Sequence, residues 1–169
     1  MNKRFRPSWD ELFMFQVYVG AMRSSCVHLQ TGALIVKDKR VIASGYNGAP
    51  PTIENCLDQG CRKDEYKVKF NKKGTGTCRG AHAEMNAMSQ IARKELKGTT
   101  LYSLYFPCSA CAKQIVGNEV AEVVYSKMYQ DPDSLTKELF MESGVKLRQL
   151  EIDIEKYFKI LKALNNREV

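Results

Sequence analysis

The sequence contains no apolar run that approaches the ~20 residues needed to cross a membrane. The basic start, residues 1–6, is not followed by the apolar stretch of a signal peptide, because Asp10 and Glu11 interrupt it. Internal repeats and heptads are also missing. We therefore expect one globular domain over residues 1–169, located in the cytoplasm and not associated with a membrane.

Acidic residues are fewer than basic ones, with 19 Asp and Glu against 26 Lys and Arg and a formal net charge of +7. Such a balance attracts anionic partners, which include both nucleotide phosphates and polynucleotides. A basic surface that is merely solvated would give the same balance. The charge therefore identifies no substrate.

Histidine is scarce, with two residues, whereas cysteine occurs six times. In a chain expected to be intracellular, cysteines argue for metal binding or catalysis before disulfides. His82, Cys108 and Cys111 supply three ligands, and a catalytic zinc takes three protein ligands and leaves one position for water. The spacing of Cys108 and Cys111 lets both thiolates meet one ion from the first turn of a helix.

Glu84 follows His82 by two residues. At the start of a helix, His82 can point to the metal while Glu84 reaches the metal-bound water, where a carboxylate suits proton transfer. The positive ends of two helix dipoles would face the zinc and help to keep the cysteines as thiolates. A structural zinc is the alternative, but such sites are normally closed by four Cys or His ligands. We therefore favour a catalytic zinc.

Hydrophobic periodicity predicts alternating helices and strands, which is typical of an α/β layered domain. Ser8 and Glu11 form a capping box that starts a mostly buried first helix. The Asp38-Lys39 pair predicts a hairpin turn, and Gly144 predicts a helix C-cap. The expected helices are 8–23, 83–96, 109–116, 132–143 and 151–165, and the expected strands are 31–36, 41–45, 99–105, 119–125 and 145–150.

The chain resembles the deoxycytidylate (dCMP) deaminases of the cytidine deaminase superfamily, most widely between residues 24 and 129. The resemblance rests on four segments, which read TGALIV (31–36), GYNGAP (45–50), HAEMNA (82–87) and FPCSACAK (106–113). His-x-Glu followed by Pro-Cys-x-x-Cys is the signature of zinc-dependent nucleobase deaminases. The resemblance implies a three-layer fold, with a mixed five-stranded sheet and helices on both faces.

The same resemblance implies hydrolysis of dCMP to dUMP with release of ammonia, in the supply of dTTP precursors. Zinc would lower the pKa of its water, and Glu84 would carry a proton to N3 of the base and then assist the loss of ammonia. Asn47 would lie near the sugar, and Tyr129 would line the substrate pocket. A homo-oligomer with dCTP and dTTP as effectors is also implied.

Residues 52–80 form an irregular, lysine-rich insertion that needs an anchor in a compact domain. By resemblance to relatives with a second, structural ion, Cys26, Cys56, Cys61 and Cys78 would close a tetrahedral zinc site that fastens the insertion. Free buried cysteines are the alternative.

Other functions stay open. Residues 26–31 lack the proline or arginine that relatives often place near the substrate phosphate, so another cytosine nucleotide or nucleoside is an alternative substrate. Adenosine in tRNA is a further alternative substrate. Asn47 and Asn86 argue against this substrate and against polynucleotide partners. A non-catalytic, zinc-stabilised protein that handles nucleic acid is the alternative of another class. The presence of Glu84 beside all three ligands argues against that alternative.

Overall fold

The computed structural model describes residues 5–72, 76–129 and 134–166. Within these ranges five strands form one sheet, and eight helices surround it. In chain order the elements are α1 (Trp9–Ala21), β1 (Gly32–Lys37), β2 (Arg40–Tyr46), α2 (Cys56–Gln59), α3 (Arg62–Glu65), α4 (Ala83–Met88), α5 (Arg93–Leu96), β3 (Thr100–Tyr105), α6 (Ser109–Gly117), β4 (Glu122–Lys127), α7 (Ser134–Ser143), β5 (Lys146–Gln149) and α8 (Ile154–Asn165).

The sheet has the strand order β2-β1-β3-β4-β5. Strand β1 pairs antiparallel with β2 and β3, whereas β3 with β4 and β4 with β5 are parallel pairs. The predicted mixed five-stranded sheet is therefore confirmed. The β1–β2 hairpin turns at Asp38 and Lys39, whose φ angles of 48° and 60° are both positive, as expected for a tight hairpin turn.

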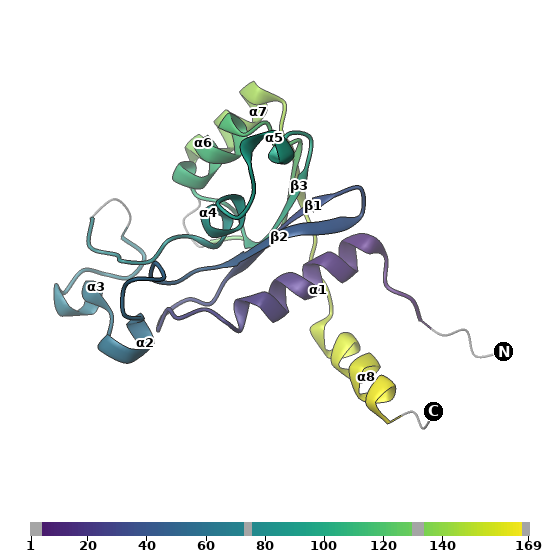
Figure 1. The fold of residues 1–169 in the computed structure, drawn as a ribbon, viewed down its shortest axis with the longest axis horizontal. Coiled ribbons are helices and arrows are strands. Elements are labelled where there is room, and N and C mark those ends of the chain that lie inside the picture. Colours follow the sequence, from purple (N-terminus) through teal and green to yellow (C-terminus); the bar gives the residue numbers. More distant parts are fainter. Residues whose placement is uncertain (1–4, 73–75, 130–133, 167–169) are drawn as a thin grey trace.

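Helices cover both faces of the sheet (Figure 1), so the three-layer arrangement is confirmed. Side chains of β1 alternate between the faces: Leu34 and Val36 belong to the core under α1, and Ala33 and Ile35 to the core under α4, α6 and α7. The α4 side holds the small residues that let helices approach the sheet closely.

Several predicted boundaries differ from the structure. The single helix expected over 83–96 is wrong, because α4 ends at Met88 and α5 starts at Arg93. The Ser89 hydroxyl donates a hydrogen bond to the Asn86 carbonyl (2.9 Å), a local bond that competes with continuation of the helix. Strand β4 begins three residues later than expected, since Glu119 takes a positive φ of 57° in the preceding turn.

The C-terminal helices agree better with the sequence. The expected start of a helix at Pro132 lies outside the described residues, but α7 ends directly before Gly144, which has the positive φ (74°) of a C-cap. Helix α8 ends at Asn165 as expected, but it starts at Ile154, three residues later than expected. Its N-cap residue is Asp153, whose carboxylate accepts a hydrogen bond from the Lys156 N–H (3.4 Å).

The insertion (residues 52–80) extends away from the sheet and contains the two short helices α2 and α3 (Figure 1). Lys63 fastens part of it: its buried Nζ donates to the carbonyls of Phe70 and Lys72, both at 2.7 Å. Apart from these two helices, the described residues of this segment form neither helix nor strand.

Helix α1 starts with the predicted capping box, in which the Glu11 N–H donates to Ser8 Oγ and the Ser8 N–H to Glu11 Oε2. The prediction that α1 is mostly buried holds only on its sheet side: Val19 is 48% exposed and Met22 73%. None of the helices in the described ranges combines the length and apolar character that crossing a membrane requires.

Candidate active site

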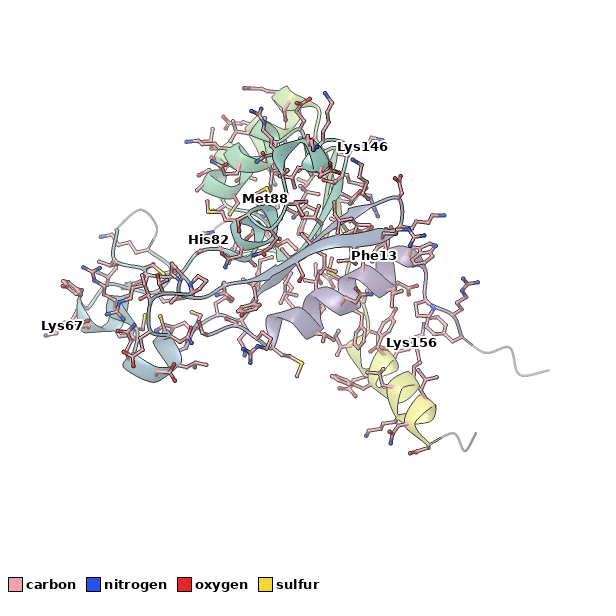
Figure 2. The ribbon with its side chains drawn as sticks, in the orientation of Figure 1. Phe13, Lys67, His82, Met88, Lys146 and Lys156 are labelled. Carbon is pink, nitrogen blue, oxygen red and sulfur yellow. The ribbon has the colours of Figure 1, made fainter. Side chains whose placement is uncertain are left out.

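Three potential zinc ligands meet at the starts of two helices. His82 is the N-cap residue of α4, Cys108 is the N-cap residue of α6, and Cys111 lies in the first turn of α6. His82 Nδ1 lies 3.4 Å from Cys108 Sγ and 3.4 Å from Cys111 Sγ. His82 lies on the side of α4 toward the insertion (Figure 2). The structure thus brings together the three ligands that the sequence predicts.

The spacing of these atoms fits a zinc ion. Zinc bonds of roughly 2.1 Å to nitrogen and 2.3 Å to sulfur place tetrahedral ligand atoms about 3.5 Å apart. Among the described residues, no fourth His, Cys, Asp or Glu ligand atom joins this group within 4.8 Å. The donor set therefore suits a catalytic zinc, in which the fourth position belongs to water or substrate.

The two cysteines have different proton affinities in the metal-free protein. Hydrogen bonds from the Cys111 thiol and from His82 lower the pKa of Cys108 to about 4. The pKa of Cys111 is raised, because its proton is held in the bond to Cys108 and because the thiol is buried. The pKa of His82 is raised by its bond to Cys108. Of the two thiols, Cys108 therefore loses its proton more readily than Cys111 does.

Glu84 is buried beside these ligands, with 6% of its surface exposed. Burial raises the pKa of its carboxyl group, and a hydrogen bond with the Cys111 thiol partly opposes that shift. A buried carboxyl with a raised pKa, next to a metal site, suits proton transfer near neutral pH.

The position of α4 is fixed by its close approach to strand β2. A Cβ atom added to Gly45 would lie 2.4 Å from the Ala83 carbonyl oxygen and 2.4 Å from the Ala87 nitrogen, so only glycine allows this packing. Asn86 Nδ2 donates to the Tyr46 carbonyl (2.7 Å). These contacts hold the start of α4, and with it His82 and Glu84, against the end of β2.

The turn before α6 is fixed by a contact with helix α7. The hydroxyl of the fully buried Thr136, on α7, donates to the Pro107 carbonyl at 3.1 Å. Pro107 directly precedes Cys108. The two helix starts that carry the ligands are therefore each tied to a neighbouring element of the core.

Asn47 uses its side chain to organise the loop before β1. Its Oδ1 accepts from the Thr31 N–H (2.9 Å), and its Nδ2 donates to the Leu29 carbonyl (2.7 Å). The sequence did not reveal this structural role, and the contact of Asn47 with the sugar stays a prediction.

Tyr129 lies at the site together with an aromatic residue that sequence reasoning missed. Its ring stacks on Tyr105, at the end of β3, with centroids 5.0 Å apart and planes at 18°. Burial raises the pKa of Tyr129, and the charges of Glu84 and the two cysteine ligands raise it further, so the tyrosine lies within their electrostatic reach. The sequence could have indicated Tyr105 as a site residue only through its position, because it is an aromatic residue at the end of a strand, two residues before Pro107.

A cavity of about 320 Å³ opens at the carboxyl ends of β3 and β4. Tyr105 lines this cavity and also stacks on Tyr129, but the cavity is lined by none of the three zinc ligands and not by Glu84. The remaining lining residues are Tyr18, Ala21, Met22, His28, Leu29, Gln30, Leu104 and Lys127.

The other four cysteines are less closely gathered. Burial raises the pKa of Cys56, and the nearby thiols of Cys26, Cys61 and Cys78 raise it further, so the four lie within electrostatic reach of one another. Within the described part of the chain, however, no three of them have sulfur atoms within 4.8 Å of one another.

Cys61 instead groups with two residues that were not predicted as ligands. His28 Nε2 lies 2.8 Å from an oxygen of Asp64, and the ligand atoms of His28, Asp64 and Cys61 all lie within 4.8 Å of one another. The predicted four-cysteine set and this mixed set share Cys61 alone.

Comparison with known proteins gives matches over most of the chain. Residues 7–127 match the family model described as the cytidine and deoxycytidylate deaminase zinc-binding region. The deoxycytidylate deaminase of Schizosaccharomyces pombe is 39% identical over 147 residues, which cover 86% of this chain and 45% of that protein. ComE operon protein 2 of Bacillus subtilis is 36% identical over 166 residues, which cover 96% of this chain and 79% of that protein.

The fold also matches a solved structure. The dCMP deaminase of cyanophage S-TIM5, in complex with dCMP and dUMP, superposes with a TM-score of 0.69 at 24% identity. The match covers 87% of this chain and all of that one. At this identity the match supports the fold alone. The family relationship rests on the sequence matches to the family model and to the two relatives.

Proposed function

Because the chain belongs to the cytidine and deoxycytidylate deaminase family, we propose that it hydrolyses dCMP to dUMP and releases ammonia. The observation that carries the proposal is the geometry of His82, Cys108 and Cys111, with the buried Glu84 beside them. This arrangement supplies three zinc ligands and one proton carrier, which hydrolytic deamination needs.

The chain's own residues divide this chemistry between them. A zinc ion held by His82, Cys108 and Cys111 supplies a Lewis acid that activates water. Glu84 accepts a proton from the attacking water at its carboxylate and delivers it to N3 of the cytosine ring. It then accepts the proton of the new hydroxyl group on C4 and delivers it to the amino group, which leaves as ammonia while C4 becomes a carbonyl carbon. Burial raises the pKa of Glu84, which favours the protonated carboxyl group that donates to the substrate.

Substrate contacts are assigned to the loops around this centre. Asn47 holds the 29–31 loop and presents its remaining hydrogen-bonding capacity to the sugar. Tyr129, supported by its stacking on Tyr105, forms the wall against which the base lies.

A second zinc ion at Cys26, Cys56, Cys61 and Cys78 belongs to the same proposal. A buried donor supports it: Arg79 Nη1 is buried and has no hydrogen-bond partner in the structure. Burial and the neighbouring thiols raise the pKa of Cys56, and the positive charge of Arg79 opposes this shift, so the guanidinium lies within electrostatic reach of Cys56. Four thiolates around one zinc carry a net charge of −2, which would give this otherwise costly donor a partner.

The ligand set of the second ion can be decided by substitution. With four cysteine ligands, Cys56→Ser lowers the zinc content by one ion per chain and His28→Ala leaves it unchanged. With His28, Cys61 and Asp64 as ligands, His28→Ala lowers the zinc content by one ion per chain and Cys56→Ser leaves it unchanged. A content of one zinc per chain in the unsubstituted protein excludes both sets.

The wider context is proposed on the family relationship. The protein acts as a single domain over residues 1–169, in the cytoplasm, as a homo-oligomer, and dCTP and dTTP are its candidate effectors. Effector binding is tested by the change in dCMP turnover when each nucleotide is added.

The deciding experiment measures ammonia release from dCMP, CMP, dCTP, cytidine and tRNA by the purified zinc-loaded protein. The proposal expects dCMP to give the highest kcat/KM. A higher kcat/KM with cytidine or CMP than with dCMP would mean that the protein catalyses the same reaction on a different substrate. A higher kcat/KM with tRNA would support the adenosine alternative. No release from any of these supports the non-catalytic, nucleic-acid-handling alternative.

A further inference from the structure

The excess positive charge of this chain is concentrated in two segments. The insertion carries seven basic and four acidic residues, and residues 1–6 carry three basic residues and no acidic one. Together the two segments account for six of the seven net positive charges of the chain. Residues 1–4 lie outside the described structure, whereas most of the insertion lies within it. The insertion is therefore the described segment that would attract an anionic partner most strongly.

The outer part of the insertion carries cations that have no partner in the protein. Figure 2 shows Lys67 at the end of the insertion that lies farthest from the sheet. The acidic side chain of Asp64, in α3, is already paired with His28 at 2.8 Å. Within the described ranges, the exposed lysines whose side chains form no ion pair or hydrogen bond include Lys67, Lys69 and Lys72. Surface cations that are free in this way are available to phosphate groups.

Exposed aromatic side chains lie among these lysines. Tyr66 is 56% exposed and Phe70 37%. The guanidinium carbon of Arg62 lies 5.1 Å from the centroid of the Tyr66 ring, and Lys63 Nζ lies 5.7 Å from that of the Phe70 ring. Proteins bind single-stranded nucleic acid with this combination, because phosphates meet the cations while unpaired bases stack on the rings.

Contacts with the rest of the fold hold part of this surface in place. The His28 ring packs on Phe70 with centroids 4.8 Å apart, and it joins the insertion to the loop before β1. The buried Lys63 donates from Nζ to the carbonyl oxygens of Phe70 and Lys72, both at 2.7 Å. The segment around Phe70 is thus ordered before a ligand binds, which reduces the conformational entropy lost on binding.

Two other anionic partners fit this surface less well. Duplex nucleic acid offers its phosphates to the lysines, but its bases are stacked on one another and cannot pack on the exposed Tyr66 ring. An anionic membrane also attracts lysines, but interfacial binding requires apolar side chains that enter the bilayer. The Phe70 ring is held by His28 and Lys63 and is not free to do so.

We propose that the insertion binds single-stranded nucleic acid without preference for sequence. The surface consists of Arg62, Tyr66, Lys67, Lys69, Phe70 and Lys72. The bound strand is a partner and not a substrate, so the zinc site remains free to act on a nucleotide. Asn47 and Asn86 argue against a polynucleotide in the substrate pocket, and they do not belong to this surface. The inference is independent of the chemistry at the zinc site.

Fluorescence anisotropy of a labelled oligothymidylate of about 20 nucleotides tests the proposal on the full zinc-loaded chain. Thymine has no exocyclic amino group, so the strand can bind without being deaminated. The logarithm of the association constant should fall with the logarithm of salt concentration at a slope of roughly −2 to −3, as three or four neutralised phosphates require. Lys67→Ala combined with Lys69→Ala should raise the dissociation constant at least about tenfold and make this slope shallower by about 1.4.

Lys159→Ala combined with Lys162→Ala is the matched control. It removes the same charge from exposed positions on α8, which lies on the other side of the molecule from the insertion (Figure 1). This control should bind the strand within about twofold of the unsubstituted protein, because it leaves the proposed surface intact. Far-UV circular dichroism of all variants establishes that they are folded.

Substitution of Tyr66 tests the stacking of bases separately from the charge. Tyr66→Ala should raise the dissociation constant about fivefold or more and leave the salt slope unchanged, because stacking releases no counterions. Tyr66→Phe keeps the ring and should bind like the unsubstituted protein. A duplex of the same length should bind more weakly than the single strand.

Several outcomes would overturn the proposal. The first is the absence of binding to oligothymidylate at about 50 mM salt. The second is equal weakening by the insertion variant and the α8 variant, and the third is equal affinity for the duplex. Binding of phosphatidylserine vesicles through Lys67 and Lys69, without binding of the strand, would assign the surface to a membrane instead. A protein that deaminates dCMP but does not bind the strand would refute this inference and leave the proposed function standing.

Discussion

The two cysteine-containing regions of this protein are built in contrasting ways. His82, Cys108 and Cys111 sit at helix starts that are packed against the sheet, and their ligand atoms already have the spacing of a zinc site. Cys26, Cys56, Cys61 and Cys78 lie on loops and a short helix, within electrostatic reach but without a common centre.

The difference shows what organises each region. Where ligands are fixed by a packed core, the site exists before the ion binds, and metal binding need not order the chain. Where ligands lie in an insertion with few core contacts, the ion itself must supply the order, so part of its binding energy is folding energy. The catalytic site should thus depend on its helices, and the insertion on its metal.

The largest expected effect comes from removing one ligand in each region. Cys108→Ser should lower kcat/KM for dCMP by about 10³-fold or more, because the activating ion is lost. Cys56→Ser should retain most activity while losing the other zinc. Metal analysis and the ammonia assay on both variants give the comparison. Equal loss of activity in the two would show that the regions are not independent.

Cysteine reactivity in the zinc-stripped protein should differ strongly between the regions. The pKa of Cys108 is lowered to about 4, whereas burial raises the pKa of Cys56. At pH 6, iodoacetamide should label Cys108 on the order of 100-fold faster than Cys56, since the thiolate is the reacting form. Raising the pH to 9 should accelerate Cys56 and leave Cys108 nearly unchanged.

Peptide mapping by mass spectrometry measures both labelling rates. The denatured protein is the control, in which the two cysteines should react alike. Equal rates at pH 6 in the folded protein would contradict the bonding of Cys108 to Cys111 and His82.

Chelation should loosen the insertion more than the core. Removal of zinc should speed tryptic cleavage at Arg62 and Lys63 by about tenfold, because the insertion loses its anchor. The core segment that holds α6 should stay protected. In Cys56→Ser, which lacks the second ion, chelation should change the cleavage rate little. An insertion that is equally resistant with and without zinc would mean that protein contacts alone hold it.

A smaller effect is expected from Gly45→Ala, which tests how firmly α4 is held. The added methyl group would meet the backbone of α4 at 2.4 Å, so we expect a loss of about 1–3 kcal/mol in the free energy of unfolding and a reduced kcat. Gly20→Ala is the matched control: its Cβ would meet nothing within 4 Å, and alanine favours the helix. Chemical denaturation of both variants measures the difference.

The sequence predicted the features that depend on local chemistry. The capping box at Ser8, the turn at Asp38 and Lys39 and the C-cap at Gly144 each follow from side-chain or backbone preferences of a few residues. The placement of His82 and Cys108 at helix starts follows in the same way, as both precede helix-forming segments.

Features that depend on distant contacts were not predictable. The stacking of Tyr105 on Tyr129 and the use of Asn47 to hold the 29–31 loop arise from tertiary packing. The grouping of Cys61 with His28 and Asp64 joins the loop before β1 to the insertion, which no spacing rule reports. Sequence periodicity also assigned α8 an apolar face without showing that this face stays exposed.

The central claim is that Glu84 carries protons and does not bind the metal. Its most direct test is zinc content and dCMP turnover of Glu84→Gln, measured on the same preparation. We expect zinc at His82, Cys108 and Cys111 to be retained while ammonia release falls below detection. Loss of that zinc, or turnover close to that of the unsubstituted protein, would contradict the account.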